Sequence, residues 1–485
     1  MRRSALVTAA VAAVVFGAVA TASAAPTGTV TGAVTGAAAA GGSHADFNGD
    51  GYPDLAIGAH TAAVGDVQRA GVVAVAYGSA TGLRYETAQI VSQATPGVPG
   101  DAVTDGKWRE ATAAGDLDGD GFDDLVIHWV DKNTVLWGSK EGLTGAATVL
   151  PAGNQPRLLG GGIGIGDVNG DGVDDFVSRA IYGSYQGGGS SYGAAVLLGP
   201  LDRATGKAAG TWYRASDRLD DLVIGTVFVG DLTGDGIADV VTSGYKVLGS
   251  GAPAGTVLKG SPAGLVKGST FPAPYVYDGG HHASAFADLD KDGYQDLVTG
   301  HAERNQIFVT YGGPNGVSTT RTSRSYQQGS SGVPGMNETG DKFGSSLAVG
   351  DTNKDGYPDI AVGIPYETGL DDVNTKESGA IDVLWGSPTG VSTVGAKGFT
   401  QNAKGIPSTS EAGDHFGSAL ALLDSNRDGA TELYVGGNGE DGYKGRVWNL
   451  ATDASGVTGT GATSFSLGTL GGPSGGGNFG YRMAG

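Results

Sequence analysis

A nine-residue acidic pattern recurs seven times in this chain of 485 residues. It reads Asp-x-(Asn/Asp/Thr)-x-Asp-Gly-x-x-(Asp/Glu), and each copy runs into a short apolar stretch, as in DFNGDGYPDLAIG. Successive copies start 51 to 73 residues apart, which leaves room for about four short strands per repeat. A repeat of that size cannot bury a core alone, so neighbouring repeats must pack on one another. The copies start at Asp46, Asp116, Asp167, Asp231, Asp288, Asp351 and Asp424.

Two further markers accompany the acidic pattern. An apolar strand closed by a glycine turn follows it, as in IDVLWGSPTGV, and this marker is blurred near Leu198 and Leu450. The pair Phe343-Gly344 lies eight residues before one acidic pattern, and Phe416-Gly417 lies eight residues before the next. Each repeat therefore reads as an opening strand, an acidic loop, an apolar strand and a glycine turn.

The first repeat lacks the opening strand, because Ala38 stands in a low-complexity stretch where Phe-Gly is expected. Residues 479–485, FGYRMAG, match residues 343–349, FGSSLAV, in the same register. Such a permuted repeat requires that distant parts of the chain meet, as in a ring of blades and not in an open solenoid. We therefore predict an all-β fold, a seven-bladed β-propeller, in which strand 479–485 pairs with the first blade and closes the ring.

The composition supports this fold and narrows the partners. The chain has 90 Gly residues and only 16% charged residues, which favours short strands and many turns. The formal net charge of −20 argues against nucleic acid and anionic membranes, because both require a basic face. Cations are the natural counterpart. The chain has no Cys, so disulfides cannot stabilise it.

The acidic loops have the chemistry of calcium sites. Positions 1, 3 and 5 of such a turn point oxygens inward, Gly at position 6 permits the bend, and position 9 returns a carboxylate. Hard oxygen ligands favour Ca²⁺ over zinc or copper. Polar turns without metal are the alternative, although seven copies favour metal. We expect up to seven, mainly structural, Ca²⁺ sites with ligands Asp46, Asn48, Asp50, Asp54, Asp116, Asp118, Asp120, Asp124, Asp167, Asn169, Asp171, Asp175, Asp231, Thr233, Asp235, Asp239, Asp288, Asp290, Asp292, Asp296, Asp351, Asn353, Asp355, Asp359, Asp424, Asn426, Asp428 and Glu432.

The seventh loop is expected to be the weakest site, because Glu432 replaces Asp and Arg427 lies inside the loop. Together, the Phe-Gly strand, the acidic loop and the apolar strand resemble FG-GAP (VCBS-type) repeats, which build the integrin α-subunit head. The resemblance covers about residues 44–485. It implies a propeller with Ca²⁺ on one face and a partner mainly on the other. Such repeats occur in adhesion receptors, bacterial secreted proteins, lectins and beside hydrolase domains, so the resemblance leaves the function open.

The N-terminus predicts export. Arg2 and Arg3 precede an apolar run and a small-residue site, which is the pattern of a signal peptide over residues 1–24, cleaved near Ala24-Ala25. An uncleaved membrane anchor is the alternative. Residues 25–43 read as a flexible low-complexity lead, and residues 44–485 as the propeller. No other stretch approaches the ~18 apolar residues of a membrane helix, so we expect a secreted, extracellular protein, of bacterial type, without membrane insertion.

We expect the chain to act as an extracellular binding or adhesion module for glycan or protein, through the face opposite the calcium loops. Loops after the second strand of each blade emerge there, and tyrosine beside Gly, Ser and Asn suits such contacts. Tyrosines that merely shield blade edges are the alternative reading. The candidate ligand residues are Tyr182, Tyr185, Tyr192, Tyr366, Glu367, Asn438 and Tyr443.

A secreted hydrolase with its active site on that same opposite face is the alternative function. Residues 189–193, GSSYG, fit the G-x-S-x-G pattern, but a chain so rich in Gly and Ser yields about one such match by chance. His281-His282 and His60 are the histidines that stand out. No catalytic residue is assigned, because the metal loops account for the clustered carboxylates.

Overall fold

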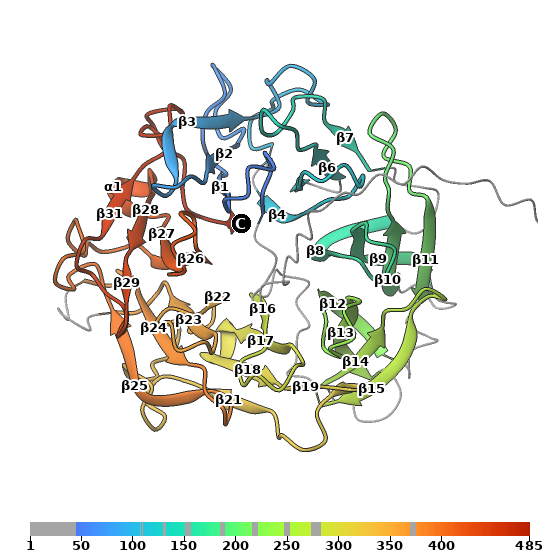
Figure 1. The fold of residues 1–485 in the computed structure, drawn as a ribbon. Helices are drawn as coiled ribbons and strands as arrows, with labels where there is room; N and C mark the ends of the chain where they lie inside the picture. Colours follow the sequence, from blue (N-terminus) through green and yellow to red (C-terminus); the bar gives the residue numbers. More distant parts are fainter. Residues whose placement is uncertain are drawn as a thin grey trace, which may run out of the picture. The chain divides into compact units, whose positions relative to one another are not determined.

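The computed structural model describes residues 45–485, apart from 107, 109, 130–131, 151–156, 185–189, 216–221, 247–252, 273–282 and 369–374. Ala40–Gly485 forms one compact unit. Seven antiparallel sheets of four strands each follow one another around a ring (Figure 1). The predicted all-β, seven-bladed β-propeller is thereby confirmed. The predicted signal peptide and low-complexity lead lie outside the described residues.

The blades follow the acidic loops in chain order. Blade 1 contains β1 (Leu55–Ala59), β2 (Val72–Tyr77), β3 (Arg84–Val91) and β32 (Met483–Ala484). Blade 2 contains β4 (Glu110–Gly115), β5 (Asp124–Trp129), β6 (Lys132–Leu136) and β7 (Thr148–Val149). Blade 3 contains β8 (Arg157–Gly166), β9 (Asp175–Ser184), β10 (Ser190–Leu198) and β11 (Gly210–Ala215). Blade 4 contains β12 (Leu222–Gly230), β13 (Asp239–Lys246), β14 (Pro253–Lys259) and β15 (Val266–Phe271).

The last three blades share this plan. Blade 5 contains β16 (Ser284–Ala287), β17 (Asp296–His301), β18 (Gln306–Thr310) and β21 (Arg324–Tyr326). Blade 6 contains β22 (Ser346–Gly350), β23 (Asp359–Ile364), β24 (Ala380–Trp385) and β25 (Ser392–Phe399). Blade 7 contains β26 (Phe416–Leu423), β27 (Glu432–Gly437), β28 (Arg446–Leu450) and β31 (Thr463–Phe465). Short elements are β19 (Gly312–Gly313), β20 (Gly316–Val317), β29 (Thr452–Asp453), β30 (Gly456–Val457), η2 (Ala302–Arg304) and α1 (Glu440–Tyr443).

The central strands of a blade are apolar because they are covered on both faces by neighbouring blades. Every residue of β2 and β23 is buried, whereas the outer strand β3 is largely exposed. The glycine turn after the third strand has a steric cause. A Cβ at Gly386 would lie 2.2 Å from the Pro358 backbone oxygen, so only glycine fits where the turn crosses the acidic loop.

The C-terminal residues lie beside the first blade (Figure 1). In β32, Met483 and Ala484 pair with Ile57 and Ala56 of β1, and the Gly58 N–H donates to the Arg482 carbonyl at 2.9 Å. The paired stretch is two residues long, shorter than the predicted 479–485.

The side chain of Phe479 forms the larger part of this junction. It is fully buried, and its backbone forms a parallel bridge with Gly445 of blade 7. Phe416 forms the same bridge with Gly379 one blade earlier. The junction between blades 7 and 1 therefore has the same local geometry as the junction between blades 6 and 7.

Candidate functional site

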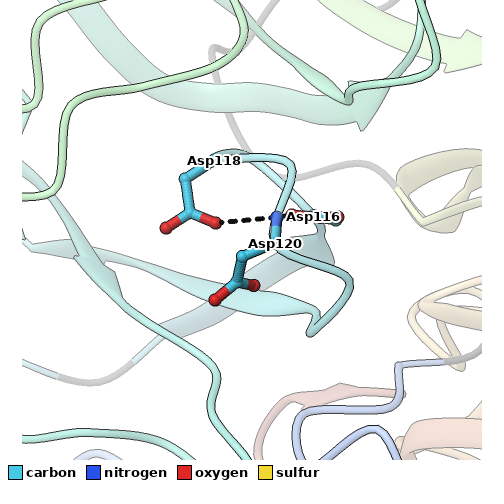
Figure 2. A group of neighbouring side chains, drawn as sticks. All are labelled: Asp116, Asp118 and Asp120. Atoms are coloured by element: carbon cyan, nitrogen blue, oxygen red, sulfur yellow. Dashed lines mark hydrogen bonds between the residues drawn. The ribbon is translucent and has the colours of Figure 1, made fainter. Parts of the chain in front are cut away.

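Six of the acidic loops join the first and second strands of their blades, and loop 1 leads into β1 beside the C-terminal β32. The seven loops therefore share one face of the ring, called here the metal-loop face. Loop 2 shows how the turn is built. The two oxygens of Asp116 accept the N–H groups of Asp120 at 3.1 Å and Gly121 at 2.9 Å. Asp118 also accepts the Asp120 N–H, at 3.3 Å (Figure 2). These bonds wrap the loop around its own first side chain.

Three loops bring carboxylate oxygens of three acidic residues within 4.8 Å of one another. Calcium bonds to oxygen are about 2.4 Å long, so two ligands on opposite sides of one ion lie about 4.8 Å apart. The donor set, oxygen without sulfur or nitrogen, is also the one that Ca²⁺ prefers. These residues therefore fit a calcium ion. The groups are Asp116, Asp118 and Asp120; Asp288, Asp290 and Asp292; and Asp424, Asp428 and Glu432.

The acid at position 9 has a second task that sequence reasoning missed. Asp124 is fully buried, and its oxygens accept the N–H groups of Leu117, in its own loop, and Gly138, after the third strand. The side chain thus ties the loop to the rest of the blade. An equivalent pair of backbone bonds is made by Asp54, Asp175, Asp239, Asp296 and Asp359.

Burial of these position-9 acids perturbs their protonation. Desolvation raises the pKa of Asp54, Asp124 and Asp296 to about 8 in each case, because a buried carboxylate loses its hydration. A nearby divalent cation would favour the charged form. A cation bound at these loops would therefore offset the free-energy cost of burying their carboxylates.

Arginines pair with two of the three acidic groups. Arg203 forms ion pairs with Asp118 and Asp120 of loop 2. Arg321 lies 2.6 Å from Asp290 of loop 5, and that carboxylate is fully buried. Sequence reasoning missed both arginines because each lies outside the acidic pattern. In loop 7, Arg427 turns away, with its guanidinium 6.0 Å from the Tyr52 ring of loop 1.

Neighbouring loops are linked around the ring through position 8. The Asp123 carboxylate accepts the Asp46 N–H of the preceding loop at 2.8 Å, and Asp174 accepts the Asp116 N–H at 3.0 Å. Burial raises the pKa of both Asp123 and Asp174 to about 6. Loops 1, 2 and 3 are thus connected to one another along this face.

On the opposite face, three of the predicted ligand residues gather around His415. The His415 ring lies 4.8 Å from the Tyr366 ring and 6.2 Å from the Tyr443 ring, between centroids. Its Nδ1 lies 3.2 Å from Asn438 Oδ1. Tyr366 and Tyr443 are 39% and 58% exposed, whereas His415 is buried. The group Tyr366, Glu377, His415, Asn438 and Tyr443 is called here the His415 site.

His415 was missed because its neighbours come from three separate segments. It directly precedes Phe416-Gly417 and has φ of +56°, a conformation shared by Lys342 and Asn478 at the same repeat position. The position directly before Phe-Gly in the repeat is therefore the sequence signal that could have identified His415. Its Nε2 is buried without a hydrogen-bond partner among the described residues, 3.8 Å from Glu377 Oε2.

The remaining predicted ligand residues do not join this site. Glu367 is buried, and it accepts a hydrogen bond from Gln328 Nε2 of blade 5 at 2.6 Å, so it links two blades. Tyr182 lies in β9 and Tyr192 in β10, but nothing is described of their side chains. Tyr185 lies outside the described residues.

Some of the features considered for an enzyme lie in the described part of the chain. Ser190 and Ser191 lie within β10, so the G-x-S-x-G match is not at a strand-to-helix turn. The His60 ring lies 4.2 Å from the Tyr481 ring, between centroids, in a tilted arrangement, and His281-His282 fall outside the described residues. None of the helices in the described part of the chain is long and apolar enough to cross a membrane.

The fold and loops define a class, the β-propellers with acidic loops on one face. The FG-GAP repeat model matches residues 38–75, 108–127 and 343–384. The chain therefore contains FG-GAP repeats in these three segments. Human integrin alpha-6 is 33% identical over 171 residues, a match that covers 33% of this chain and 13% of integrin alpha-6.

Other known proteins are similar to parts of this chain. Human phosphatidylinositol-glycan-specific phospholipase D is 30% identical over 162 residues, which covers 32% of this chain and 18% of that protein. This chain thus spans less than a quarter of either relative's length. A solved structure of an Agrocybe aegerita lectin that recognises non-reducing terminal N-acetylglucosamine has a TM-score of 0.40 and 18% identity, and it covers 74% of this chain and 79% of that chain.

Proposed function

We propose that this chain is a secreted, calcium-binding module that binds an extracellular glycan or protein through the face opposite the metal loops. The observation that carries the proposal is the convergence of Tyr366, His415 and Tyr443 from separate segments on that face. The match to the FG-GAP repeat and the similarity to human integrin alpha-6 support this proposal.

Calcium has a structural part in this proposal. The acidic groups of loops 2, 5 and 7 supply the oxygen ligands, and a bound ion supplies positive charge to a connected face of buried acids. Position-9 residues such as Asp124 tie each loop to its blade, so an ordered loop also orders the third strand. A braced metal-loop face would hold the blades, and thereby the His415 site, in fixed relative positions.

The His415 site has the properties of a contact surface. Two exposed tyrosines offer large, rigid and amphipathic area at low entropic cost. Between them lies a histidine whose Nε2 has no hydrogen-bond partner in the described residues, next to the half-exposed Glu377. Aromatic faces beside the polar His415 and Glu377 side chains suit either a sugar ring or a protein side chain. Binding to glycans and to proteins, measured separately, distinguishes these two ligands.

The test is binding of the calcium-loaded chain to a glycan array and to immobilised matrix proteins. The variants are Tyr366→Ala and Tyr443→Ala, with Tyr294→Ala on the metal-loop face as the matched control. We expect a signal on one panel, reduced at least about tenfold by the first two changes and unchanged by the control, as for aromatic hot spots. Equal binding by all variants would place the contact elsewhere, and no binding on either panel would contradict the proposed function.

A further inference from the structure

A pocket lies on the metal-loop face at the junction of blades 7 and 1. Its volume is about 280 Å³, near the lower end of the range for small-molecule pockets. Blade 1 contributes Gly82, Leu83 and Tyr85. Blade 7 contributes Asn449 and Ala451 from the end of its third strand, Gly461 and Thr463, and Glu432, which is also the position-9 acid of loop 7.

In four of the other six blades an aromatic residue stands at the place of Ala451, and blades 3 and 4 have Leu198 and Lys259 there. Ala451 is the first residue after the third strand of blade 7, whose last residue, Leu450, pairs with Leu433 of the second strand. The residue at the same position is Tyr77 in blade 1 and Tyr311 in blade 5. Each of these tyrosines extends into the glycine turn of the next blade. Trp385 of blade 6 does the same, because a Cβ at Gly456 would lie 2.5 Å from its ring.

The tyrosine hydroxyl has a fixed partner in these blades. The Leu143 N–H donates to the Tyr77 hydroxyl at 3.0 Å, and the Val391 N–H donates to the Tyr311 hydroxyl at 3.2 Å. The residue at the corresponding place in blade 1 is Leu83, after Gly82, and both line the pocket. The space that a tyrosine side chain occupies in blades 1 and 5 is called here the slot. In blade 7 the residue at this position is Ala451, whose side chain is too short to fill the slot.

A second substitution makes the same slot polar. The residue at the Asn449 register is Val in every other blade: Val75, Val135, Val196, Val257, Val309 and Val383. The Oδ1 atom of Asn449 is buried and has no hydrogen-bond partner in the described residues. A buried acceptor without a donor destabilises the folded state, so this oxygen is expected to accept a hydrogen bond from a ligand. The fold itself does not require Asn at this position, since the other six blades have Val.

We propose that this pocket binds a phenolic ring, with the ring in the slot that Tyr77 and Tyr311 fill in their own blades. The phenol O–H donates to Asn449 Oδ1, and the phenol oxygen accepts the Leu83 N–H. The ring packs against Leu83 and Tyr85. A tyrosyl side chain of a partner and a free phenol share this chemistry. The pocket is separate from the His415 site, which lies on the other face.

The test uses the full chain at constant calcium, in calorimetric or NMR titrations. The probes are p-cresol and a tyrosine-containing pentapeptide. Toluene, which lacks the hydroxyl group, measures how much the hydroxyl contributes to the affinity. We expect saturable binding of p-cresol, at least about tenfold tighter than toluene. Tighter binding of the peptide than of p-cresol would assign the site to a partner's side chain, and the reverse order to a free phenol. Absence of saturable p-cresol binding would overturn the proposal.

Two variants test the geometry. Ala451→Tyr fills the slot from within, so we expect loss of p-cresol binding together with a higher melting temperature. Ala454→Tyr makes the same change at an exposed position three residues away and should do neither. Asn449→Val restores the residue of the other blades, so it should fold and bind p-cresol at least about tenfold more weakly. Unchanged binding by both Ala451→Tyr and Asn449→Val would refute the site.

Discussion

Replacing Phe479 by Ala tests whether the junction of blades 7 and 1 seals the ring. The Phe479 side chain is fully buried and lies 6.0 Å from the Phe465 ring in an edge-on arrangement. Removing a buried Phe costs about 3–5 kcal/mol of unfolding free energy. By contrast, β32 contributes two residue pairs and the Gly58 N–H bond, worth about 1 kcal/mol each. Phe479→Ala is therefore expected to cost more than removal of residues 483–485.

The assay is urea unfolding followed by tryptophan fluorescence, with calcium present. Phe416→Ala is the matched control, because Phe416 forms the same bridge one blade earlier and is equally buried. We expect both variants to lose about 3–5 kcal/mol. If Phe416→Ala loses that amount while Phe479→Ala stays within about 1 kcal/mol of the parent protein, the junction is not closed in solution and this reasoning is wrong.

Two further predictions follow from the buried charges. Arg203→Ala should increase calcium affinity, measured by titration calorimetry, because Arg203 pairs with Asp118 and Asp120 where an ion would bind; unchanged affinity would contradict a competing role. Burial holds the pKa of Asp382 well above its usual range, so the folded state favours the protonated form. Its contribution to stability is complete below its unfolded pKa and is lost as pH rises through its folded pKa, at up to about 1.4 kcal/mol per pH unit. Asp382→Asn should reduce the fall in unfolding free energy that urea unfolding measures from about pH 4 upward, and an unchanged pH dependence would exclude Asp382 as its source.

Local sequence patterns predicted the blades and loops because each feature lies within one repeat. The spacing of acidic loops located seven sheets, and Phe479 was recognised by its register with Phe343. The same patterns could not predict that Glu367 is buried against Gln328, since that contact joins residues 39 positions apart in different blades. Whether a loop residue is exposed depends on how the loops of the adjacent blade pack against it.

The His415 site and the arginine pairs were missed for a related reason. His415 meets Tyr366 and Tyr443 only after two blades have packed, and Arg203 reaches Asp118 across 85 residues of chain. The pocket at Ala451 was hidden differently. Its signal is a small residue at a position where four other blades have Tyr or Trp, and this becomes visible only when strand pairing fixes the register.

The most direct test of the account is a count of calcium bound per chain. The purified chain would be equilibrated by dialysis against calcium, and the bound metal measured by elemental analysis. The three groups of acidic residues and the seven loops predict three to seven ions. A second sample of Asp288→Asn should bind about one ion fewer, because it weakens one loop only. A chain that binds no calcium above the background would show that these loops are turns, and would contradict the calcium-binding role proposed for them.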